Sequence, residues 1–214
     1  MSDEKRRYRK RLRAESEAQT RLLITESAVQ LHGTLGPART SISAIAEHAG
    51  VRRSTVYRHF PDEGSLFRAC SSLWMSRNPP PDPAAWGAID DPGARVRAVL
   101  TDLYAYYRRT EPMLANLHRD EATVPAIRER FQGFREYLAG IALLIAPRGQ
   151  LRGRAHAHVA AASAHALSFG TWRSLVLEQG LAQEEAVELM VALICKAAKQ
   201  PRARVRLSSG RSGR

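Results

Sequence analysis

The spacing of apolar residues is the feature that most limits how this chain can fold. Along three long segments, apolar side chains recur every three or four residues, and no segment keeps the apolar and polar alternation of a half-buried strand. The three stripes are Ile24, Ala28, Leu31 and Leu35; Val96, Leu100, Leu103 and Tyr107; and Ile127, Phe131, Phe134, Leu138, Ile141 and Ile145. Such spacing gathers apolar side chains on one face of a helix. The sequence therefore predicts an all-α protein.

Prolines and glycines indicate where these helices begin and end. Four prolines between 79 and 83 cannot continue a helix, so we expect a linker near 78–90. Asp91 before Pro92 predicts a capped start of the next helix. Further edges are expected at Glu111-Pro112, Val124-Pro125 and Pro147-Arg148-Gly149, with a C-terminal cap at Gly180 and the last helix ending at Pro201.

Positive charge is concentrated at the two ends of the chain. The formal net charge is +12; residues 1–77 hold 14 Lys and Arg against 8 Asp and Glu, residues 78–195 hold 12 against 13, and residues 196–214 hold 7 against none. A basic N-terminal third beside a neutral middle suits a protein in which one part meets phosphates and another binds something else.

Several classes of protein are disfavoured by what the sequence contains. Apolar runs stay well short of the roughly 20 residues that span a bilayer, and no apolar segment follows the basic N-terminus, so we expect a soluble, cytoplasmic protein without membrane contact. The two cysteines, Cys70 and Cys195, lie far apart, which argues against a disulfide framework. His156 and His158 would point to different helix faces, and we expect neither a metal nor a cofactor.

Residues 41–60 have the pattern of two short helices joined by a sharp turn. Ser41 is a good N-cap for a helix that buries Ile42, Ile45, Ala46 and Ala49 and ends at Gly50, where a positive φ is free of a Cβ clash. The second helix would bury Val51 and Val56. Its outward residues are donors and cations with no acid among them, which suits entry into a DNA major groove: Arg52, Arg53, Ser54, Thr55, Tyr57, Arg58 and His59.

The wider segment 20–70 resembles the TetR family of transcription regulators. The resemblance rests on Ile24, Ala28 and Leu31, on Thr40-Ser41-Ile42, Ile45-Ala46 and Ala49-Gly50-Val51, on Ser54-Thr55-Val56-Tyr57-Arg58-His59-Phe60, and on Leu66-Phe67. It implies a homodimer that binds a palindromic operator in double-stranded DNA, a base-reading helix near 52–58, phosphate contacts at Ser41, Thr55, Tyr57 and His59, and a buried Phe60. The family's usual lysine contact at the start of the fourth helix is Glu63 here, which puts that contact in doubt.

This resemblance and the breaks divide the chain into four expected parts. They are a basic arm at 1–19, a helix-turn-helix domain at 20–77, a helical effector-binding and dimerisation domain at 91–200 with about five helices, and a basic tail at 201–214. In the arm, Lys5–Arg13 holds seven cations in nine residues, so we expect an extended, mobile segment. It would either follow DNA phosphates or enter a minor groove, or else act as a solubilising tail.

The expected ligand domain offers candidate lining residues, each of which would also suit a core. An effector cavity is expected among the helices near 93–108, 125–145 and 152–179, with a small, mainly apolar or aromatic ligand. The candidates are Tyr104, Tyr107, Phe134, His165, Phe169 and Trp172. The resemblance implies that helices from about 151 to 199 form the dimer interface, although the same alanine-rich surface would suit an internal helix.

The favoured function is a DNA-binding transcriptional regulator, most simply a repressor whose operator binding responds to a ligand. The sequence has no nucleophile elbow, phosphate-binding glycine loop or zinc protease motif, so we expect no enzyme. The alternatives are a protein that uses its basic ends to bind DNA without sequence preference, or to act as a scaffold, and a helical enzyme built from scattered residues.

Overall fold

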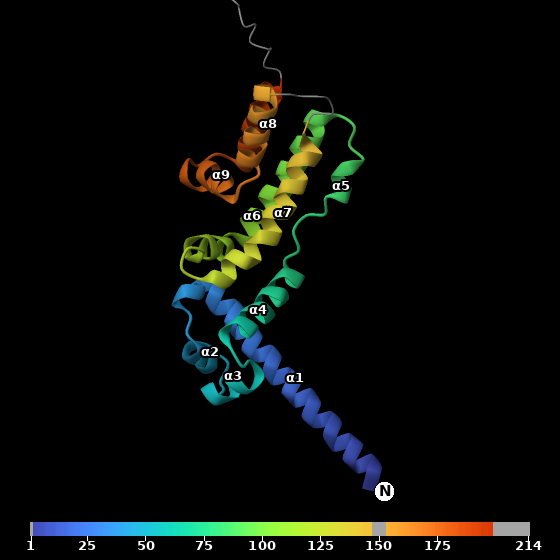
Figure 1. Ribbon diagram of the computed structural model, residues 1–214, viewed down its shortest axis with the longest axis vertical. Helices are drawn as coiled ribbons and strands as arrows, with labels where there is room; N and C mark the ends of the chain where they lie inside the picture. Colours follow the sequence, from blue (N-terminus) through green and yellow to red (C-terminus); the bar gives the residue numbers. More distant parts are fainter. Residues whose placement is uncertain (1, 147–152, 199–214) are drawn as a thin grey trace, which may run out of the picture. The chain divides into compact units, whose positions relative to one another are not determined.

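The computed structural model describes residues 2–146 and 153–198, and every regular element in these ranges is helical (Figure 1). The elements are α1 (Ser2–Thr34), η1 (Pro37–Arg39), α2 (Ile42–His48), α3 (Arg53–His59), α4 (Glu63–Arg77), α5 (Ala84–Gly87), α6 (Pro92–Asp120), α7 (Pro125–Ile145), α8 (Gly153–Ala166), α9 (Phe169–Arg173), η2 (Ser174–Glu178) and α10 (Gln183–Ala198). The all-α prediction is confirmed. None of the described helices is long and apolar enough to cross a membrane.

Most helix boundaries follow the local signals in the sequence. Asp91 caps α6, where its Oδ1 accepts a hydrogen bond from the Ala94 amide at 2.6 Å. α7 begins at Pro125, as expected, and Gly180 has φ +71° after the single π-helical turn η2. The expected edge at Pro147 and the expected end at Pro201 lie outside the described residues. Capping and backbone freedom therefore set these boundaries locally.

Two boundaries differ from the expectation. Pro112 lies inside α6 instead of ending a helix. The missing backbone donor is tolerated because Met113 and Leu114, which follow it, are buried. Residues 2–19 continue α1 instead of forming an extended arm, because Arg, Lys, Glu, Ala and Gln are strong helix formers and the helix grows from a turn already packed in the core.

The chain forms two compact units; of the three boundaries between them, one follows Pro81 and the other two fall within α6 and α7. One unit comprises Met1–Pro81 and Ala105–Tyr137, and the other comprises Asp82–Tyr104 and Leu138–Arg214. The four-part division expected from the sequence stays a prediction, since these units are defined by packing and each includes parts of α6 and α7.

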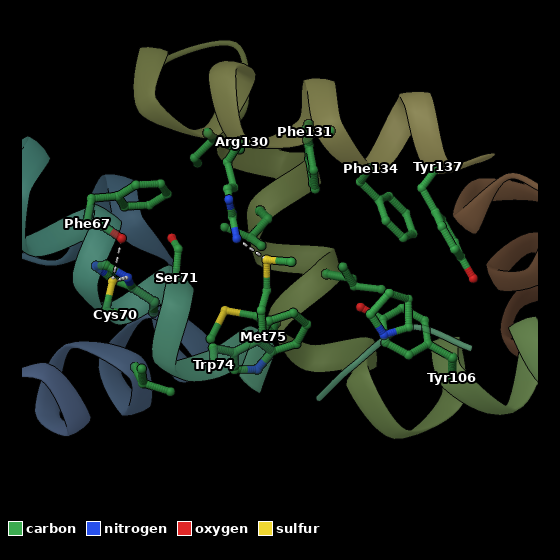
Figure 2. Close-up of a pocket in the computed structure, with 18 residues that line it drawn as sticks. Phe67, Cys70, Ser71, Trp74, Met75, Tyr106, Arg130, Phe131, Phe134 and Tyr137 are labelled. Carbon is green, nitrogen blue, oxygen red and sulfur yellow. Dashed lines mark hydrogen bonds between the residues drawn. The ribbon is translucent and has the colours of Figure 1, made fainter. Parts of the chain in front are cut away.

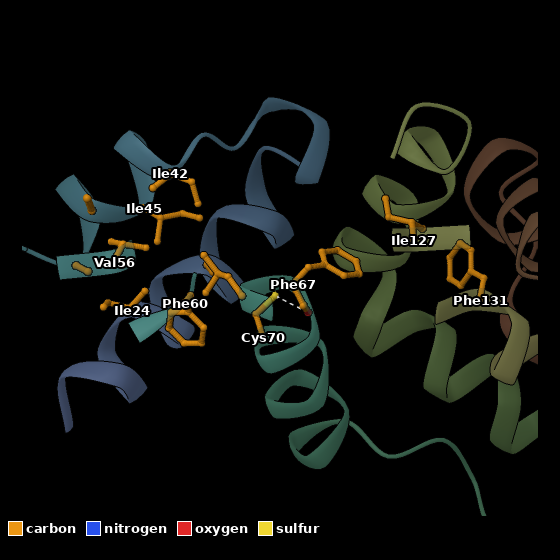
Figure 3. Packing of buried hydrophobic residues seen from close by; sticks show 13 residues of the cluster. Ile24, Ile42, Ile45, Val56, Phe60, Phe67, Cys70, Ile127 and Phe131 are labelled. Atoms are coloured by element: carbon orange, nitrogen blue, oxygen red, sulfur yellow. Dashed lines mark hydrogen bonds between the residues drawn. The ribbon is translucent and has the colours of Figure 1, made fainter. Parts of the chain in front are cut away.

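The core of the first unit holds the helix-turn-helix segment against α1 and α4 (Figure 3). Ile24 and Ala28 of α1 are fully buried, as is Val56 of α3, and Phe60 is 1% exposed just after α3. The buried cluster continues through Phe67 and Cys70 of α4 to Ile127 and Phe131 of α7. α3 therefore packs on the same core that carries side chains of α4 and α7.

In the second unit, buried polar groups of α6 are satisfied by backbone carbonyls. The Arg95 side chain is 2% exposed and donates to the carbonyl oxygens of Ile89, Asp90 and Leu144 at 2.7–3.2 Å. Tyr104 donates to the Ala166 carbonyl at 2.9 Å. α8 and α10 lie against each other in this unit. These bonds satisfy polar atoms that would otherwise be costly to bury.

The last turns of α6 close the corner between α1 and α2. Asn116 donates to the carbonyls of His32 and Gly33, which belong to the last turn of α1, at 3.1 and 2.8 Å. Arg119 donates to the Leu35 carbonyl at 2.8 Å, and Asp120 accepts a hydrogen bond from the Ala38 amide at 3.0 Å. Gly36 has φ +92°, and a Cβ there would collide with the Arg119 and Asp120 side chains.

Replacing Asp120 with alanine is expected to lower the free energy of unfolding by about 1–3 kcal/mol, because the Ala38 amide and the Arg119 guanidinium would be left without a charged acceptor. Asp120→Asn keeps an acceptor and should cost less. Urea unfolding measures both, with the exposed Glu129→Ala as control. A change below about 0.5 kcal/mol for Asp120→Ala would show that this corner is not held by the carboxylate.

Candidate nucleic-acid interface and apolar cavity

The turn between α2 and α3 has the geometry that its sequence predicts. Ser41 accepts a hydrogen bond from the Ala44 amide at 3.1 Å and so caps α2. Gly50 has φ +65°, and the Val51 amide donates to the Ala46 carbonyl at 2.9 Å across the turn. These contacts fix the direction in which α3 leaves α2.

α3 presents a polar, cationic surface to solvent. Arg52, Arg53, Ser54, Tyr57 and Arg58 are exposed, and Thr55 and His59 are half-buried. Within α3 only Val56 is buried. The structure therefore brings seven of the eight sequence-predicted DNA-binding residues together on this helix and its N-cap, while Ser41 lies at the start of α2.

Arg53 and Tyr57 form a pair on this surface. The Arg53 guanidinium donates to the Tyr57 hydroxyl at 3.2 Å and lies 5.5 Å from the centre of its ring. This hydrogen bond raises the pKa of Arg53, and the negative charge of Glu63 contributes in the same direction. Tyr57 thus restricts where the Arg53 guanidinium can lie before any partner binds.

His59 has a different environment from the other predicted contacts. Burial lowers the pKa of His59, and the nearby charges of Arg58 and Arg21 lower it further. Its Nε2 is buried without a hydrogen-bond partner among the described residues. His59 is therefore neutral at pH 7, and its phosphate contact stays a prediction.

Sequence reasoning missed Arg21, which joins α1 to the end of α3. Its guanidinium donates to the His59 carbonyl at 2.5 Å and lies 4.0 Å from the centre of the Phe60 ring. Arg21 thus satisfies a carbonyl at the C-terminus of α3 and covers the aromatic ring that anchors it. The contact spans 38 residues, and no local pattern around Arg21 indicates it.

An apolar cavity of about 170 Å³ lies in the same unit, among α1, α4, α6 and α7 (Figure 2). Figure 2 shows Phe131, Phe134 and Tyr137 of α7 pointing across it toward Trp74, Met75 and Tyr106. The complete lining is Val29, His32, Phe67, Cys70, Ser71, Trp74, Met75, Pro80, Tyr106, Met113, Leu114, Leu117, Ile127, Arg130, Phe131, Gly133, Phe134 and Tyr137. No carboxylate is among these residues.

The polar groups in the cavity are mostly uncharged. Burial lowers the pKa of His32 to about 4, partly offset by the charge of Asp120, so its imidazole is neutral at pH 7. Its Nδ1 lies 3.5 Å from the Cys70 sulfur. Burial raises the pKa of Cys70 to about 12, which leaves an unreactive thiol. Arg130, which contacts the sulfur of Met75, is the one permanent charge in the lining.

Of the six residues predicted to bind a ligand, Phe134 lines this cavity. Tyr107 is buried beside Tyr106 in the first unit, with their ring centres 6.0 Å apart. Tyr104, Phe169 and Trp172 are buried in the second unit, and His165 is exposed on α8. These five do not line the cavity, and their ligand contacts stay a prediction. Sequence reasoning did not predict Trp74, Met75 and Met113 as cavity-lining residues, because their spacing does not distinguish residues that line a cavity from residues of a solid core.

A sequence comparison identifies the helix-turn-helix segment. Residues 24–70 match the family described as bacterial regulatory proteins, tetR family. Residues 24–70 are therefore similar to the helix-turn-helix segment of TetR-family regulators. The match covers Ser41 through His59, so the sequence comparison and the geometry of α2 and α3 agree on a helix-turn-helix. A comparison with curated protein sequences finds no significant match.

Solved structures show that the TetR fold extends beyond this segment. A Clostridium perfringens protein proposed to regulate fatty acid metabolism aligns with a TM-score of 0.57 at 16% identity, covering 82% of this chain and 97% of that one. A TetR transcription regulator from Haloarcula marismortui aligns with a TM-score of 0.53 at 17% identity, covering 85% of this chain and 97% of that one. The multidrug binding protein EbrR, complexed with imidazole, aligns with a TM-score of 0.50 at 22% identity, covering 82% of this chain and 90% of that one.

The neutral His32 makes stability depend on pH in a defined direction. Its folded pKa of about 4 lies below the ordinary value of 6.5, so the unfolded chain takes up a proton first. We expect His32 to contribute about 3 kcal/mol of stability above pH 6.5, which is lost progressively as the pH falls to about 4.

Urea unfolding between pH 7.5 and 4.5 measures this contribution. His32→Gln should flatten the acid-induced loss of stability, whereas the exposed His48→Gln should leave it unchanged. Equal slopes for His32→Gln and the wild type would mean that folding does not lower the pKa of His32.

Proposed function

We propose that this chain is a transcriptional regulator, most simply a repressor, that binds a palindromic operator as a homodimer and releases or retains it according to a small apolar ligand. The observation that supports this most strongly is the exposed face of α3. This face and the N-cap carry Arg52, Arg53, Ser54, Tyr57 and Arg58, with no acidic residue among them. Val56 is the one buried side chain of α3. Such a face suits hydrogen bonding to phosphates and base edges.

Two copies are needed because one helix-turn-helix contacts one half-site. The described surface of the second unit offers a contact area: Leu189 and Leu193 are 48% and 40% exposed and lie one turn apart on α10, against an α8 rich in exposed alanines. Small side chains allow close approach of a second helix pair. With two-fold symmetry the reading helices would meet successive major grooves, about 34–36 Å apart.

The cavity suits a ligand that is mainly apolar and small. An engineered apolar cavity of about 150 Å³ holds benzene, which gives the scale of an occupant here. Aromatic rings and thioethers line it, and His32 and Cys70 are uncharged at pH 7. A bound sugar would leave its hydroxyl groups without partners.

The packing of the first unit gives a physical route from the ligand to α3. Phe67 and Cys70 line the cavity and also belong to the core cluster that contains Val56 and Phe60. A ligand that shifts these two side chains of α4 therefore changes the packing beneath α3. By linkage, the ligand and the operator alter each other's affinity by the same factor.

Base reading is tested with Arg53 and Tyr57. Arg53→Ala should relax the preference at one symmetric pair of operator positions, because a bidentate arginine–guanine pair contributes about 1–3 kcal/mol of discrimination. Tyr57→Phe should weaken binding to all duplexes about equally if Tyr57 contacts phosphate. If Tyr57 acts by positioning Arg53, Tyr57→Phe will reproduce part of the loss of preference.

The measurement uses a duplex selected from a random library and a panel of its single-base variants, with sedimentation to count chains per duplex. The wild type should prefer the selected duplex over random sequence by about 10³-fold or more, with two chains for each palindrome. Equal affinity for both would favour the alternative, a protein that binds DNA through charge alone.

Ligand binding is tested by filling the cavity from Gly133. Gly133 lines the cavity and a Cβ there meets no atom within 4 Å, so we use Gly133→Leu to introduce a bulky side chain at the cavity. We expect it to abolish the binding of a small aromatic probe such as indole, measured by calorimetry, while DNA binding is kept. It should also stabilise α7 by removing a helical glycine, a gain of up to about 1 kcal/mol.

Gly140→Leu is the matched control on α7, because it also has open space for a Cβ but does not line the cavity. It should show the same gain in stability and the same probe binding as the wild type. If both variants bind the probe equally well, the cavity is not the ligand site.

A further inference from the structure

The N-terminal part of α1, residues 2–20, is a cationic helix that no described packing explains. The side chains of residues 4–19 are all exposed, and Lys5–Arg13 contains seven Lys and Arg. A helix that is polar on all sides and lacks an apolar face contributes little to folding. Because the helix continues far beyond the core, it offers a regular charged surface that a partner can cover.

Most of the positive charges on this helix form no ion pair within the described residues. Arg11 pairs with Glu15 at 3.4 Å, one turn along the helix. Lys5, Arg6, Arg9, Lys10 and Arg13 form no ion pair with any described carboxylate. Unpaired cations held on a regular scaffold favour a polyanion, whose binding releases counterions.

The distribution of these cations around the helix selects the kind of polyanion. At 100° per residue, the seven Lys and Arg of residues 5–13 together cover roughly two thirds of the circumference. The remaining strip holds Tyr8 and Leu12, which are one turn apart, together with Glu4 and Glu15. A helix that lies on a membrane needs a broad apolar face, which is missing here. Cations on several sides instead suit a groove with phosphates along both walls.

The helix leaves the domain beside the DNA-reading element. Arg21 donates to the His59 carbonyl at the end of α3, so every residue before Arg21 lies beyond that contact on α1 (Figure 1). From Arg21 to Ser2 the helix rises about 29 Å, at 1.5 Å per residue. That length equals about eight base pairs of duplex.

We propose that residues 2–20 form a second DNA-binding element, which binds the phosphates of duplex flanking the half-site contacted by α3. The proposal rests on the proposed function for its partner, and it extends that function from a short operator to a longer one. The flanking contact is independent of base sequence, since Lys and Arg would meet phosphates only.

The experiment compares two duplexes, the minimal selected operator and the same operator with ten random base pairs added on each side. The variant Arg9→Gln/Lys10→Gln/Arg13→Gln removes three cations and keeps good helix formers. The control Arg108→Gln/Arg128→Gln/Arg173→Gln removes three exposed cations from other helices. Affinities are measured for the wild type and both variants at several salt concentrations.

We expect the wild type to bind the longer duplex at least tenfold more tightly, and the arm variant to lose this advantage while binding the minimal duplex as before. The slope of log K against log salt should fall by about 0.9 for each phosphate that the variant no longer neutralises. The control should retain both the advantage and the slope. Equal binding of both duplexes by the wild type, or an unchanged slope in the arm variant, would overturn the proposal.

Two further outcomes separate this proposal from its rivals. If the wild type does not distinguish the selected operator from random duplex, the proposed function fails, whatever the arm does. If the arm variant loses binding to vesicles of phosphatidylglycerol and phosphatidylcholine but keeps its affinity for the longer duplex, the helix is a membrane-surface element and the DNA assignment is wrong.

Discussion

The burial of one face of α1 is the interaction on which the first unit depends. Ile24 and Ala28 are completely buried, and the side chains that pack with them come from α2, α3 and α4. The same helix supplies Val29 and His32 to the cavity and Arg21 to the end of α3. Because close-packed interiors transmit small shifts, a change at the cavity cannot be confined to α4. α1 thus both supports α3 and forms one wall of the cavity.

Local chemistry accounts for what the sequence could predict. Ser41, Gly50 and Asp91 each act through atoms within a few residues, as a cap or as a backbone conformation, so their roles are readable in the sequence. Phe60 was predictable as a core residue from the family pattern and is 1% exposed. The helical conformation of residues 2–19 differs from the expected extended arm, because the helix propensity of these residues outweighs the repulsion between their like charges.

The position of the cavity could not be predicted from the sequence, because tertiary packing determines which residues line it. Trp74, Met113 and Phe134 have the same apolar spacing as residues of solid core, and the empty space between them depends on how four helices meet. Tyr104 and Trp172 are buried in the second unit, and their ligand contacts stay a prediction. The helix edge expected at Pro112 is wrong, because burial of the residues after it outweighs one missing backbone donor.

The small buried area of α3 has a consequence for how such a protein can change over evolutionary time. Val56 is the single buried residue of the helix, so the other positions from Arg53 to His59 carry little of the stability of the fold. Substitutions there alter which groups face a partner without opening a void in the core. After gene duplication, one copy could therefore acquire a different set of exposed groups on α3 through surface changes alone. Its cavity would be inherited intact, because the residues that line the cavity belong to other helices.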